Sequence, residues 1–203
     1  MALIAVEGID GAGCGTQAER LQQFLENEHG GAELYTYPDY QHPTGELLQH
    51  FLDGRFDLST EEQFLLYLSN MIGDQDTIGK TLARGNHVVA DRYVTSTLAY
   101  QEVNGMDRQT MLNVINELGL VQPDLVIHLD CPVTEAHSRK QEEKEEMDRY
   151  EEDMENQRQV ARTYKDLASE NVYSREWTTI DASPPVDRVQ QDIQDAVEKE
   201  IDL

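Results

Sequence analysis

The chain has 203 residues, and 40 acidic residues against 16 basic ones give it a formal net charge of −24. A chain of this length buries roughly 70% of its unfolded surface, so one domain needs neither disulfides nor a structural metal. So negative a surface excludes a general binder of nucleic acid or of anionic membranes, because both need a basic face. High charge with few aromatic residues also suggests disorder, but 38% of the residues are apolar and occur in ordered blocks.

The basic residues are 5 lysines and 11 arginines. A carboxylate-rich, lysine-poor surface stays soluble where salt screens its self-repulsion within a few Å. This composition favours a protein of a high-salt cytoplasm, with an ordinary acidic cytosolic protein as the alternative. Cys14 and Cys131 show neither a disulfide framework nor metal-ligand spacing. We see neither a basic leader nor an apolar run of the roughly 18 residues that a membrane span needs. We therefore expect a cytoplasmic protein that does not span a membrane.

Short apolar runs alternate with longer helical patterns along the chain. In chain order we expect a strand at Ala2–Val6, a helix at Gln17–Glu28, a strand at Leu34–Tyr37, a helix over 60–84 that opens on a capping box of Thr60 and Gln63, a strand at His87–Ala90, a helix at Arg108–Leu118, strands at Leu125–Leu129 and Trp177–Ile180, and a helix over 186–197. Strands that are apolar on both faces are typical of a parallel sheet between two helical layers. We therefore predict a three-layer, doubly wound α/β domain over residues 1–203, with five parallel strands.

Residues 138–158 have a different composition. They contain nine acidic and five basic residues and almost no apolar ones, so they are too polar to form core. The segment is expected to be a solvated helix pair, a mobile flap, or both, and a merely solvated face is the alternative.

Directly after the first expected strand, residues 8–16 read Gly-Ile-Asp-Gly-Ala-Gly-Cys-Gly-Thr. Both glycines of the phosphate-loop pattern G-x-x-x-x-G-K-[ST] are present, in a strand–loop–helix context. The backbone N–H groups of such a loop bind a polyphosphate, and the hydroxyl of Thr16 suits Mg²⁺. Cys14 stands where lysine belongs, and Gly15 stands where serine or threonine is usual. A glycine-rich turn without a ligand is the alternative, and a thiol beside helix amides suggests a lowered pKa for Cys14.

Several motifs now resemble one family. Val6–Gly13 with Thr16 and Gln17 resembles the opening of the thymidylate kinases, within the nucleoside monophosphate kinases. The resemblance continues in order through Tyr37-Pro38-Asp39 with Thr44-Gly45, Asp91-Arg92-Tyr93, Ser96–Gln101, Pro123-Asp124-Leu125 and Asp148–Glu151. It implies a P-loop kinase fold, Mg²⁺-dependent transfer of a phosphoryl group from ATP to dTMP, a lid over the phosphate donor at about residues 138–158, and commonly a homodimer.

The resemblance assigns a role to each motif. Asp10 faces the acceptor and takes its sugar 3′-hydroxyl, Asp91 accepts the charge or the waters of Mg²⁺, and Arg92 clamps the transferring phosphoryl group. Asp91 and Arg92 also follow a strand end, which is where doubly wound sheets place their active sites. The implied contacts to ATP and its phosphates are Gly8, Asp10, Gly11, Ala12, Gly13, Cys14, Gly15, Thr16, Gln17 and Arg139. The implied metal ligands are Thr16 and Asp91.

On the acceptor side, Tyr67 falls where the family stacks a ring on thymine. Thr97, Tyr100 and Gln101 map onto the base edge and the sugar wall, where Tyr100 favours deoxyribose. The full implied dTMP site is Asp10, Tyr37, Pro38, Tyr67, Met71, Arg92, Thr97, Tyr100 and Gln101. From the residues alone, Tyr67 on a helical apolar stripe is more often a core aromatic, and the other three suit a helix cap with surface polar groups.

Three departures from the family pattern stand out. Cys14 removes a charge worth on the order of 10²–10³ in rate, and Met71 and Tyr40 stand where relatives carry acceptor-side arginines. The lid offers four cations in compensation: Arg139, Lys140, Lys144 and Arg149. Our hypothesis is that Arg149 acts as a catalytic residue and takes part of the missing role. A kinase for another nucleoside monophosphate and a catalytically weak nucleotide-binding homologue are the alternative functions.

Overall fold

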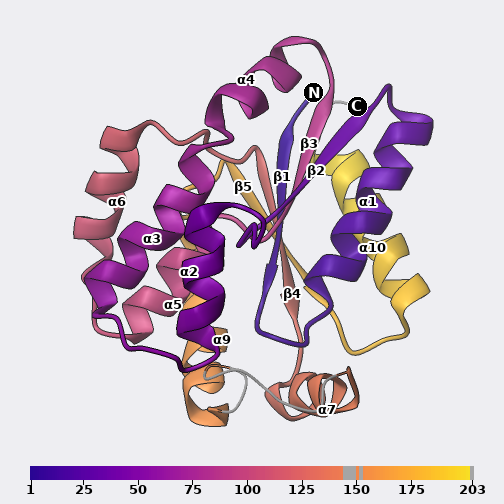
Figure 1. The fold of residues 1–203 in the computed structure, drawn as a ribbon. Helices are drawn as coiled ribbons and strands as arrows, with labels where there is room; N and C mark the ends of the chain where they lie inside the picture. The colour runs from indigo at the N-terminus through magenta and orange to yellow at the C-terminus, as the bar shows by residue number, and fades with distance from the viewer. Residues whose placement is uncertain (144–149, 151–152, 202–203) are drawn as a thin grey trace.

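The computed structural model describes residues 1–143, 150 and 153–201. Five parallel strands form one sheet in the order β2-β3-β1-β4-β5 (Figure 1). Their bounds are β1 Leu3–Gly8, β2 Ala32–Thr36, β3 His87–Asp91, β4 Leu125–Asp130 and β5 Glu176–Asp181. β1 is buried along its whole length, as expected for the central strand of a parallel sheet with both faces covered. The predicted five-stranded parallel sheet is confirmed.

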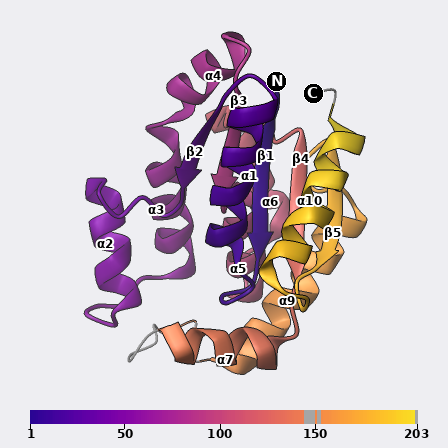
Figure 2. The same cartoon turned by 90° about the vertical axis from the view of Figure 1, so that its right-hand side faces the viewer.

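Helices cover both faces of the sheet (Figures 1 and 2). α1 (Cys14–Glu28) and α10 (Val186–Glu200) cover one face. The other face carries α5 (Val94–Val103) and α9 (Met154–Ser169), with α2 (Pro43–Leu52), α3 (Thr60–Ile72) and α6 (Arg108–Leu118) on the same side. α4 (Gln75–Ala83) lies near the amino-terminal end of β1, and α7 (Val133–Glu143) lies below the carboxyl ends of the strands. The doubly wound, three-layer prediction is therefore confirmed.

The prediction of a single helix over 60–84 is wrong, because α3 and α4 are separate helices. They meet at Gly73 and Asp74, and the carboxylate of Asp74 accepts a hydrogen bond from the hydroxyl of Tyr37 at 2.9 Å. The expected capping box is also displaced by one residue. Ser59 and Glu62 form it, with each side chain accepting from the other residue's backbone N–H.

The periodicity of the sequence did not reveal α5. Residues 94–101 are all buried, so this helix has no polar stripe to contrast with an apolar one. α5 carries Thr97, Tyr100 and Gln101, so its placement decides the acceptor side of the predicted site.

Both ends of the polar segment 138–158 are helical, because α7 extends to Glu143 and α9 starts within the segment. α7 begins at Val133, before the expected boundary, and α9 begins at Met154. A Cβ atom placed on Gly11 would come within 2.2 Å of the carbonyl oxygen of Ala136, so α7 lies directly against the phosphate loop. Residues 144–149 and 151–152 of this segment fall outside the described residues.

Candidate active site

A cavity of about 400 Å³ opens at the carboxyl ends of β1 and β3. β1 and β3 are neighbours, with Val6 opposite Asp91, so the loop after β1 and the residues after β3 emerge side by side. The following predicted site residues line the cavity: Asp10, Gly11, Gly13, Cys14, Gly15, Thr16, Tyr37, Pro38, Tyr67, Met71, Asp91, Arg92, Thr97, Tyr100 and Gln101. The fold thus brings the predicted phosphate, metal and acceptor residues into one space.

The phosphate loop depends on glycine at two positions. Gly11 and Gly13 have φ angles of 83° and 96°, in the left-handed region that other residues rarely adopt. Gly13 precedes the first residue of α1, whose opening N–H groups have no helical carbonyl to bind. A helix N-terminus of this kind favours an anion.

Gly15 has a different reason to be small. A Cβ atom there would lie 3.1 Å from the Oδ2 atom of Asp91, which is tighter than an ordinary contact. Glycine lets the Asp91 carboxylate approach the first turn of α1. Burial raises the pKa of Asp91, and the positive charges of Arg92 and Lys140 oppose that rise.

Cys14 points away from solvent. Its side chain is buried, and its Sγ atom lies 3.3 Å from the position that a Cβ atom on Gly8 would take. Burial, opposed by the positive charge of Arg92 and aided by the negative charges of Asp91, Glu7 and Asp10, raises the pKa of the Cys14 thiol to about 12. The expectation of a lowered pKa was wrong, because burial outweighs the proximity of the helix amides.

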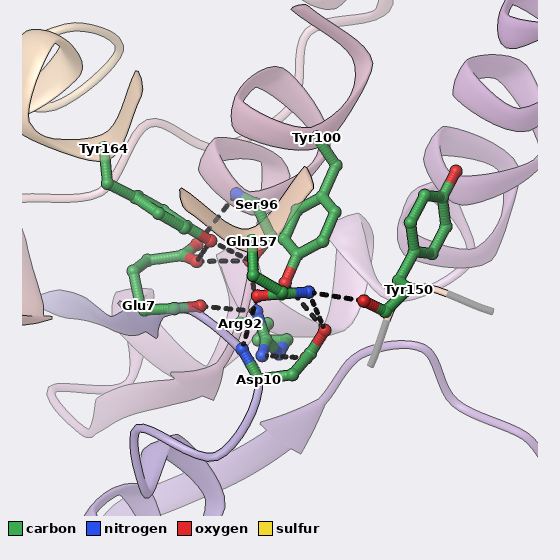
Figure 3. Close-up of polar contacts among 9 residues, drawn as sticks. Glu7, Asp10, Arg92, Ser96, Tyr100, Tyr150, Gln157 and Tyr164 are labelled. Carbon is green, nitrogen blue, oxygen red and sulfur yellow. Dashed lines mark hydrogen bonds and ion pairs between the residues drawn. The ribbon is translucent and has the colours of Figure 1, made fainter. Parts of the chain in front are cut away.

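Asp10 and Arg92 form an ion pair inside the cavity, with 2.6 Å between Oδ1 and Nη2 (Figure 3). The other guanidinium nitrogen of Arg92 donates to the carbonyl of Gly8 at 2.8 Å and to the hydroxyl of Ser96 at 3.3 Å. The second carboxylate oxygen of Asp10 accepts from the hydroxyl of Tyr100 at 2.8 Å. Arg92 has a φ angle of 62°, an unusual turn for a residue other than glycine. These contacts fix the guanidinium between the loop and α5.

Glu7 is a site residue that our reading of the sequence missed. Its carboxylate is fully buried and accepts from the backbone N–H groups of Tyr93 at 2.9 Å and Ser96 at 3.2 Å, and from the hydroxyl of Tyr164 at 3.0 Å (Figure 3). The hydroxyls of Thr95 and Ser96 also donate to it. Glu7 therefore caps α5 from the neighbouring strand. Burial raises its pKa, and the hydrogen bonds oppose that rise. A charged residue in an otherwise apolar strand was the available signal.

Gln157, at the start of α9, is the second missed residue. Its amide accepts from the backbone N–H of Asp10 at 3.3 Å, and it donates to the Asp10 carboxylate at 2.9 Å and to the carbonyl of Tyr150 at 3.1 Å (Figure 3). Tyr150 in turn donates to Gln63 on α3 and accepts from Asn104 after α5. Gln157 therefore connects the end of the polar segment to the phosphate loop. Nothing in the local sequence distinguishes it from other polar residues there.

The acceptor side of the cavity contains polar atoms without partners among the described residues. Thr97 Oγ1 and Gln101 Nε2 are buried and form no hydrogen bond, although both residues line the cavity. Buried polar atoms are normally paired, so these two atoms are available to bond a polar group placed in the cavity. Tyr67 is half-buried in the same wall. The hydroxyl of Tyr37 is bound to Asp74, so Tyr37 presents its ring to the cavity.

Met71 and Tyr40 line the cavity as the sequence pattern suggested. Met71 is 2% exposed, whereas Tyr40 is 46% exposed. Neither residue offers a positive charge. Two basic residues that follow Tyr40 in the chain already have partners: His42 caps the first turn of α2, and Arg55 pairs with Asp53 at 3.2 Å.

Three predicted phosphate-loop contacts lie outside the cavity wall. Gly8 is required by packing, because a Cβ atom there would lie 3.0 Å from the carbonyl oxygen of Leu129. Ala12 is buried in the core. Gln17 is also buried, and its amide donates to the carbonyl of Val186 at 3.0 Å, which directs it toward α10.

The predicted lid cations are not equally placed. Arg139 pairs with Glu135 at 2.6 Å and donates to the carbonyl of Ala182 at 2.9 Å, so it faces the loop between β5 and α10. Arg149, our proposed substitute for the missing lysine, and Lys144 lie outside the described residues. The Arg149 hypothesis therefore stays a prediction.

The oxygen atoms of Thr16 and Asp91 suit magnesium. Both residues line the cavity beside the start of α1, and hydroxyl and carboxylate oxygens are the hard donors that Mg²⁺ prefers. No group of three His, Cys, Asp or Glu residues fit to hold a metal occurs in the described parts of the chain. A site with one or two protein oxygens fits Mg²⁺, which takes its remaining ligands from phosphates and water.

A glycine-rich loop that joins the central parallel strand to a helix places this chain among the P-loop phosphotransferases. The acceptor wall on α3 and α5 indicates a nucleotide kinase within that class. The family model for thymidylate kinase matches residues 6–193. The chain belongs to the thymidylate kinase family.

Relatives match over most or all of the chain. The thymidylate kinase of Danio rerio is 30% identical over 203 residues, which cover 100% of this chain and 92% of that protein. The probable thymidylate kinase of Thermococcus kodakarensis is 35% identical over 176 residues, covering 81% of this chain and 83% of that protein. The solved structure of the thymidylate kinase from Candida albicans is similar with a TM-score of 0.78 at 25% identity, and covers 98% and 91% of the two chains.

Proposed function

We propose that this protein transfers the γ-phosphoryl group of ATP to dTMP to give dTDP. Its family, matched from residue 6 to residue 193, supports this reaction and this acceptor. The observation that carries the proposal is the shared cavity. The phosphate loop lines one space with Thr97 and Gln101, whose Oγ1 and Nε2 atoms have no partner among the described residues, and the Asp10–Arg92 pair lies in the same wall.

We assign base recognition to the acceptor wall. Thymine offers two carbonyl oxygens and one N–H group along one edge. The amide of Gln101 and the hydroxyl of Thr97 both donate and accept, so they suit this edge. Tyr67 stacks on the base from α3. The Tyr100 hydroxyl, held on Asp10 at 2.8 Å, closes the sugar side and favours deoxyribose, while Asp10 receives the 3′-hydroxyl.

Phosphoryl transfer needs positioning and charge neutralisation more than covalent chemistry from the protein. Arg92 directs its guanidinium toward the transferring group, and the loop amides from Gly11 to Thr16 hold the donor phosphates. Thr16 and Asp91 would hold Mg²⁺, which when bound neutralises charge on the donor phosphates. Arg139 lies beside Ala182 in the loop after β5, and we assign it to the donor nucleotide.

The lid is proposed to comprise about residues 138–158, which begin within α7. α7 lies against the phosphate loop at Gly11, and Gln157 bonds Asp10 from the other end of the segment. A cover in this place excludes water from the phosphates. Water exclusion favours transfer to the nucleotide over hydrolysis of ATP.

We also propose a cytoplasmic homodimer adapted to high salt. None of the described helices is both long and apolar enough to cross a bilayer. Leu65 and Ile72 are 55% and 41% exposed on α3, which supports a partner surface on this helix. Size-exclusion chromatography with light scattering measures the dimer. Equal unfolding midpoints at about 0.1 M and 2 M KCl would contradict salt adaptation, since the screening length falls from about 10 Å at 0.1 M to less than about 3 Å above 1 M.

A turnover screen tests the proposed reaction. The purified protein, kept in high KCl with Mg-ATP, is offered dTMP, dUMP, dCMP, dGMP and UMP in turn, and ADP formation is followed. ADP formed with dTMP supports the proposal, whereas ADP formed only with another acceptor would identify a different nucleotide kinase. No turnover with any acceptor, together with nucleotide-dependent thermal stabilisation, would identify a catalytically weak binding homologue.

A further inference from the structure

A chain of hydrogen bonds runs from the start of α3 to the acceptor wall. The carbonyl of Leu58 accepts from Nε2 of Gln63 at 2.9 Å, and Oε1 of Gln63 accepts from the hydroxyl of Tyr150 at 2.5 Å. The oxygen of Tyr150 accepts in turn from Nδ2 of Asn104 at 2.9 Å. The same Nδ2 atom donates to Oε1 of Gln101 at 3.5 Å. The chain therefore ends on an amide that lines the cavity.

The carbonyl of Leu58 fixes the direction of the whole chain. A backbone carbonyl can only accept, so Gln63 turns its NH₂ group to it and its oxygen to Tyr150. Tyr150 gives its one hydroxyl proton to Gln63, so toward Asn104 it can only accept. Asn104 therefore presents its NH₂ group to both Tyr150 and Gln101. Turning any of these amides would bring two donors or two acceptors together.

Further contacts hold the middle of the chain in place. The ring of Tyr150 packs edge-on against Tyr100, with centroids 5.5 Å apart, and lies tilted against Phe51 at 6.3 Å. The backbone of Asn104 accepts from the hydroxyl of Thr60 at 3.2 Å and donates to the carbonyl of Tyr100 at 3.1 Å. Tyr150 and Asn104 thus have positions that do not depend on a ligand.

The last amide of the chain faces the cavity as a donor. Gln101 is fully buried and lines the cavity, and its Nε2 atom has no partner among the described residues. Because its oxygen is turned to Asn104, its NH₂ group is the part left for a ligand. An N–H group bonds a carbonyl oxygen, whereas opposite an amino group it stays unpaired. Thr97 does not discriminate in this way, since its hydroxyl rotates to donate or accept.

We propose that Asn104 is a positioning residue which, with Gln63 and Tyr150, fixes the Gln101 amide so that the site selects a nucleotide base with a carbonyl group over one with an amino group at the same ring position. The inference rests on the proposed phosphorylation of dTMP and adds how the base is chosen. Thymine has a carbonyl group at ring position 4, where cytosine has an amino group. Gln101 donates to this 4-carbonyl of thymine.

The test compares the binding of two nucleotides to the folded protein. Calorimetry at constant KCl gives the Kd of dTMP and the Kd of 5-methyl-dCMP, which share the sugar, the phosphate and the 5-methyl group. The two bases differ only in the edge at ring positions 3 and 4, so the ratio of the 5-methyl-dCMP Kd to the dTMP Kd measures how that edge is read. For the wild type this ratio is expected to be about ten or more, because a mismatched buried polar group costs affinity.

The variant Asn104→Asp replaces the NH₂ group with an oxygen of the same shape. A carboxylate there accepts from Gln101, so the Gln101 amide turns and presents its oxygen to the cavity. The ratio is expected to fall by at least about tenfold. The added charge acts on both nucleotides alike and cancels in the ratio. Asn113→Asp adds the same charge to an exposed residue of α6 that is not part of the cavity wall, and it leaves the ratio unchanged.

A second variant tests the same chain one step earlier. Tyr150→Phe keeps the ring and its packing but removes the hydroxyl, so Asn104 loses the partner that orients it. The ratio is expected to fall by at least about threefold. Urea unfolding midpoints show whether each variant folds, and Tyr150→Phe decides the question if Asn104→Asp does not fold.

Two results would overturn the inference. One is a ratio for the deciding variant within about twofold of the wild type. The other is a wild type that binds 5-methyl-dCMP as tightly as dTMP. Failure of the proposed function is seen differently, as absence of ADP formation with every acceptor, and the Kd ratio does not depend on turnover.

Discussion

The buried Glu7 carboxylate joins the central strand to the helix that carries the acceptor wall, and its removal is a stringent test of the site. One oxygen accepts two backbone N–H groups, from Tyr93 and Ser96, and the hydroxyl of Thr95. The other accepts the hydroxyls of Ser96 and Tyr164. The N–H groups are fixed by the backbone, whereas the hydroxyls can rotate to new partners.

Two substitutions at Glu7 distinguish the role of its side chain as a hydrogen-bond acceptor from the role of its negative charge. Glu7→Leu leaves two buried N–H groups unpaired at about 1–3 kcal/mol each, so we expect a loss of about 4 kcal/mol. The hydroxyls of Ser96 and Tyr164 lie 2.8 Å apart and bond each other, so they add little. Glu7→Gln keeps an acceptor for the N–H groups, and its amide donates to those two hydroxyls. Its cost is expected to stay below about 1.5 kcal/mol at neutral pH.

Urea unfolding at constant KCl measures both losses, and its pH dependence tests the protonation of Glu7. The folded state raises the pKa of Glu7 through burial, so it binds the proton more tightly than the unfolded chain does. Tighter proton binding by Glu7 adds to the free energy of unfolding. This contribution is fully present below the ordinary glutamate pKa of about 4.3 and is lost as the pH rises through the pKa of the folded state. The stability advantage of the wild type over the non-titrating Glu7→Gln is therefore largest in acid and shrinks as the pH rises.

Two outcomes would refute this reasoning. Equal losses in Glu7→Gln and Glu7→Leu would mean that the negative charge, and not the acceptor oxygen, holds α5. An advantage of the wild type that grows with pH would mean that the folded state favours the ionised carboxylate. The kcat gives an independent reading, because Ser96 also bonds Arg92 and Glu7→Leu is expected to reduce turnover through it.

Three further predictions follow from the packing of the site and the core. Gly11→Ala and Gly13→Ala both introduce left-handed strain of about 1–2 kcal/mol, but only the first also drives a Cβ atom into Ala136. Urea unfolding is therefore expected to show a larger loss for Gly11→Ala by about 1–3 kcal/mol. With a pKa of about 12, the buried Cys14 thiol is expected not to react with a disulfide reagent at pH 8 until the protein unfolds, and rapid native labelling would contradict its burial. Burial lowers the pKa of His128 to about 4, so stability present above about pH 6.5 is lost as the pH falls toward 4, by about 3 kcal/mol; His128→Phe is expected to flatten that part of the urea–pH curve.

The strands were predictable because each is a short apolar run in a sheet covered on both faces. Helix α5 was not, since burial on every side of Val94–Gln101 removes the contrast on which periodicity depends. The break between α3 and α4 is a tertiary feature, in which Asp74 turns to bond Tyr37. Local patterns thus predicted the elements, and contacts between distant segments set their limits.

The residues of the candidate site also differ in how well the sequence predicts them. The phosphate loop was predictable because its glycines and its strand–helix context are contiguous in sequence. Asp10 and Gln157 are 147 positions apart, and no local pattern relates them. Glu7 was visible as a charged residue in an apolar strand, but its partners on α5 depend on a helix that the sequence did not reveal. Residues that hold the site together are therefore harder to predict than residues that we expect to contact the ligand.

The net charge of −24 leads to a last prediction about phosphate binding. The surface repels an approaching anion over about 10 Å at 0.1 M salt, but over only about 3 Å at 1 M. Inside the cavity, the side chain of Arg92 is 18% exposed and pairs with Asp10, and buried contacts are screened much less than exposed ones. Added KCl therefore weakens the repulsion more than the attraction.

Comparison of dTMP with uncharged thymidine isolates this effect, because salting-out of the base acts on both. The ratio of the thymidine Kd to the dTMP Kd, measured by calorimetry on the folded protein, is expected to rise from low to high KCl. Ordinary attraction of a phosphate to exposed cations gives the opposite slope, since salt screens it. A falling ratio would mean that surface cations capture the phosphate and that the acidic surface has no part in its approach.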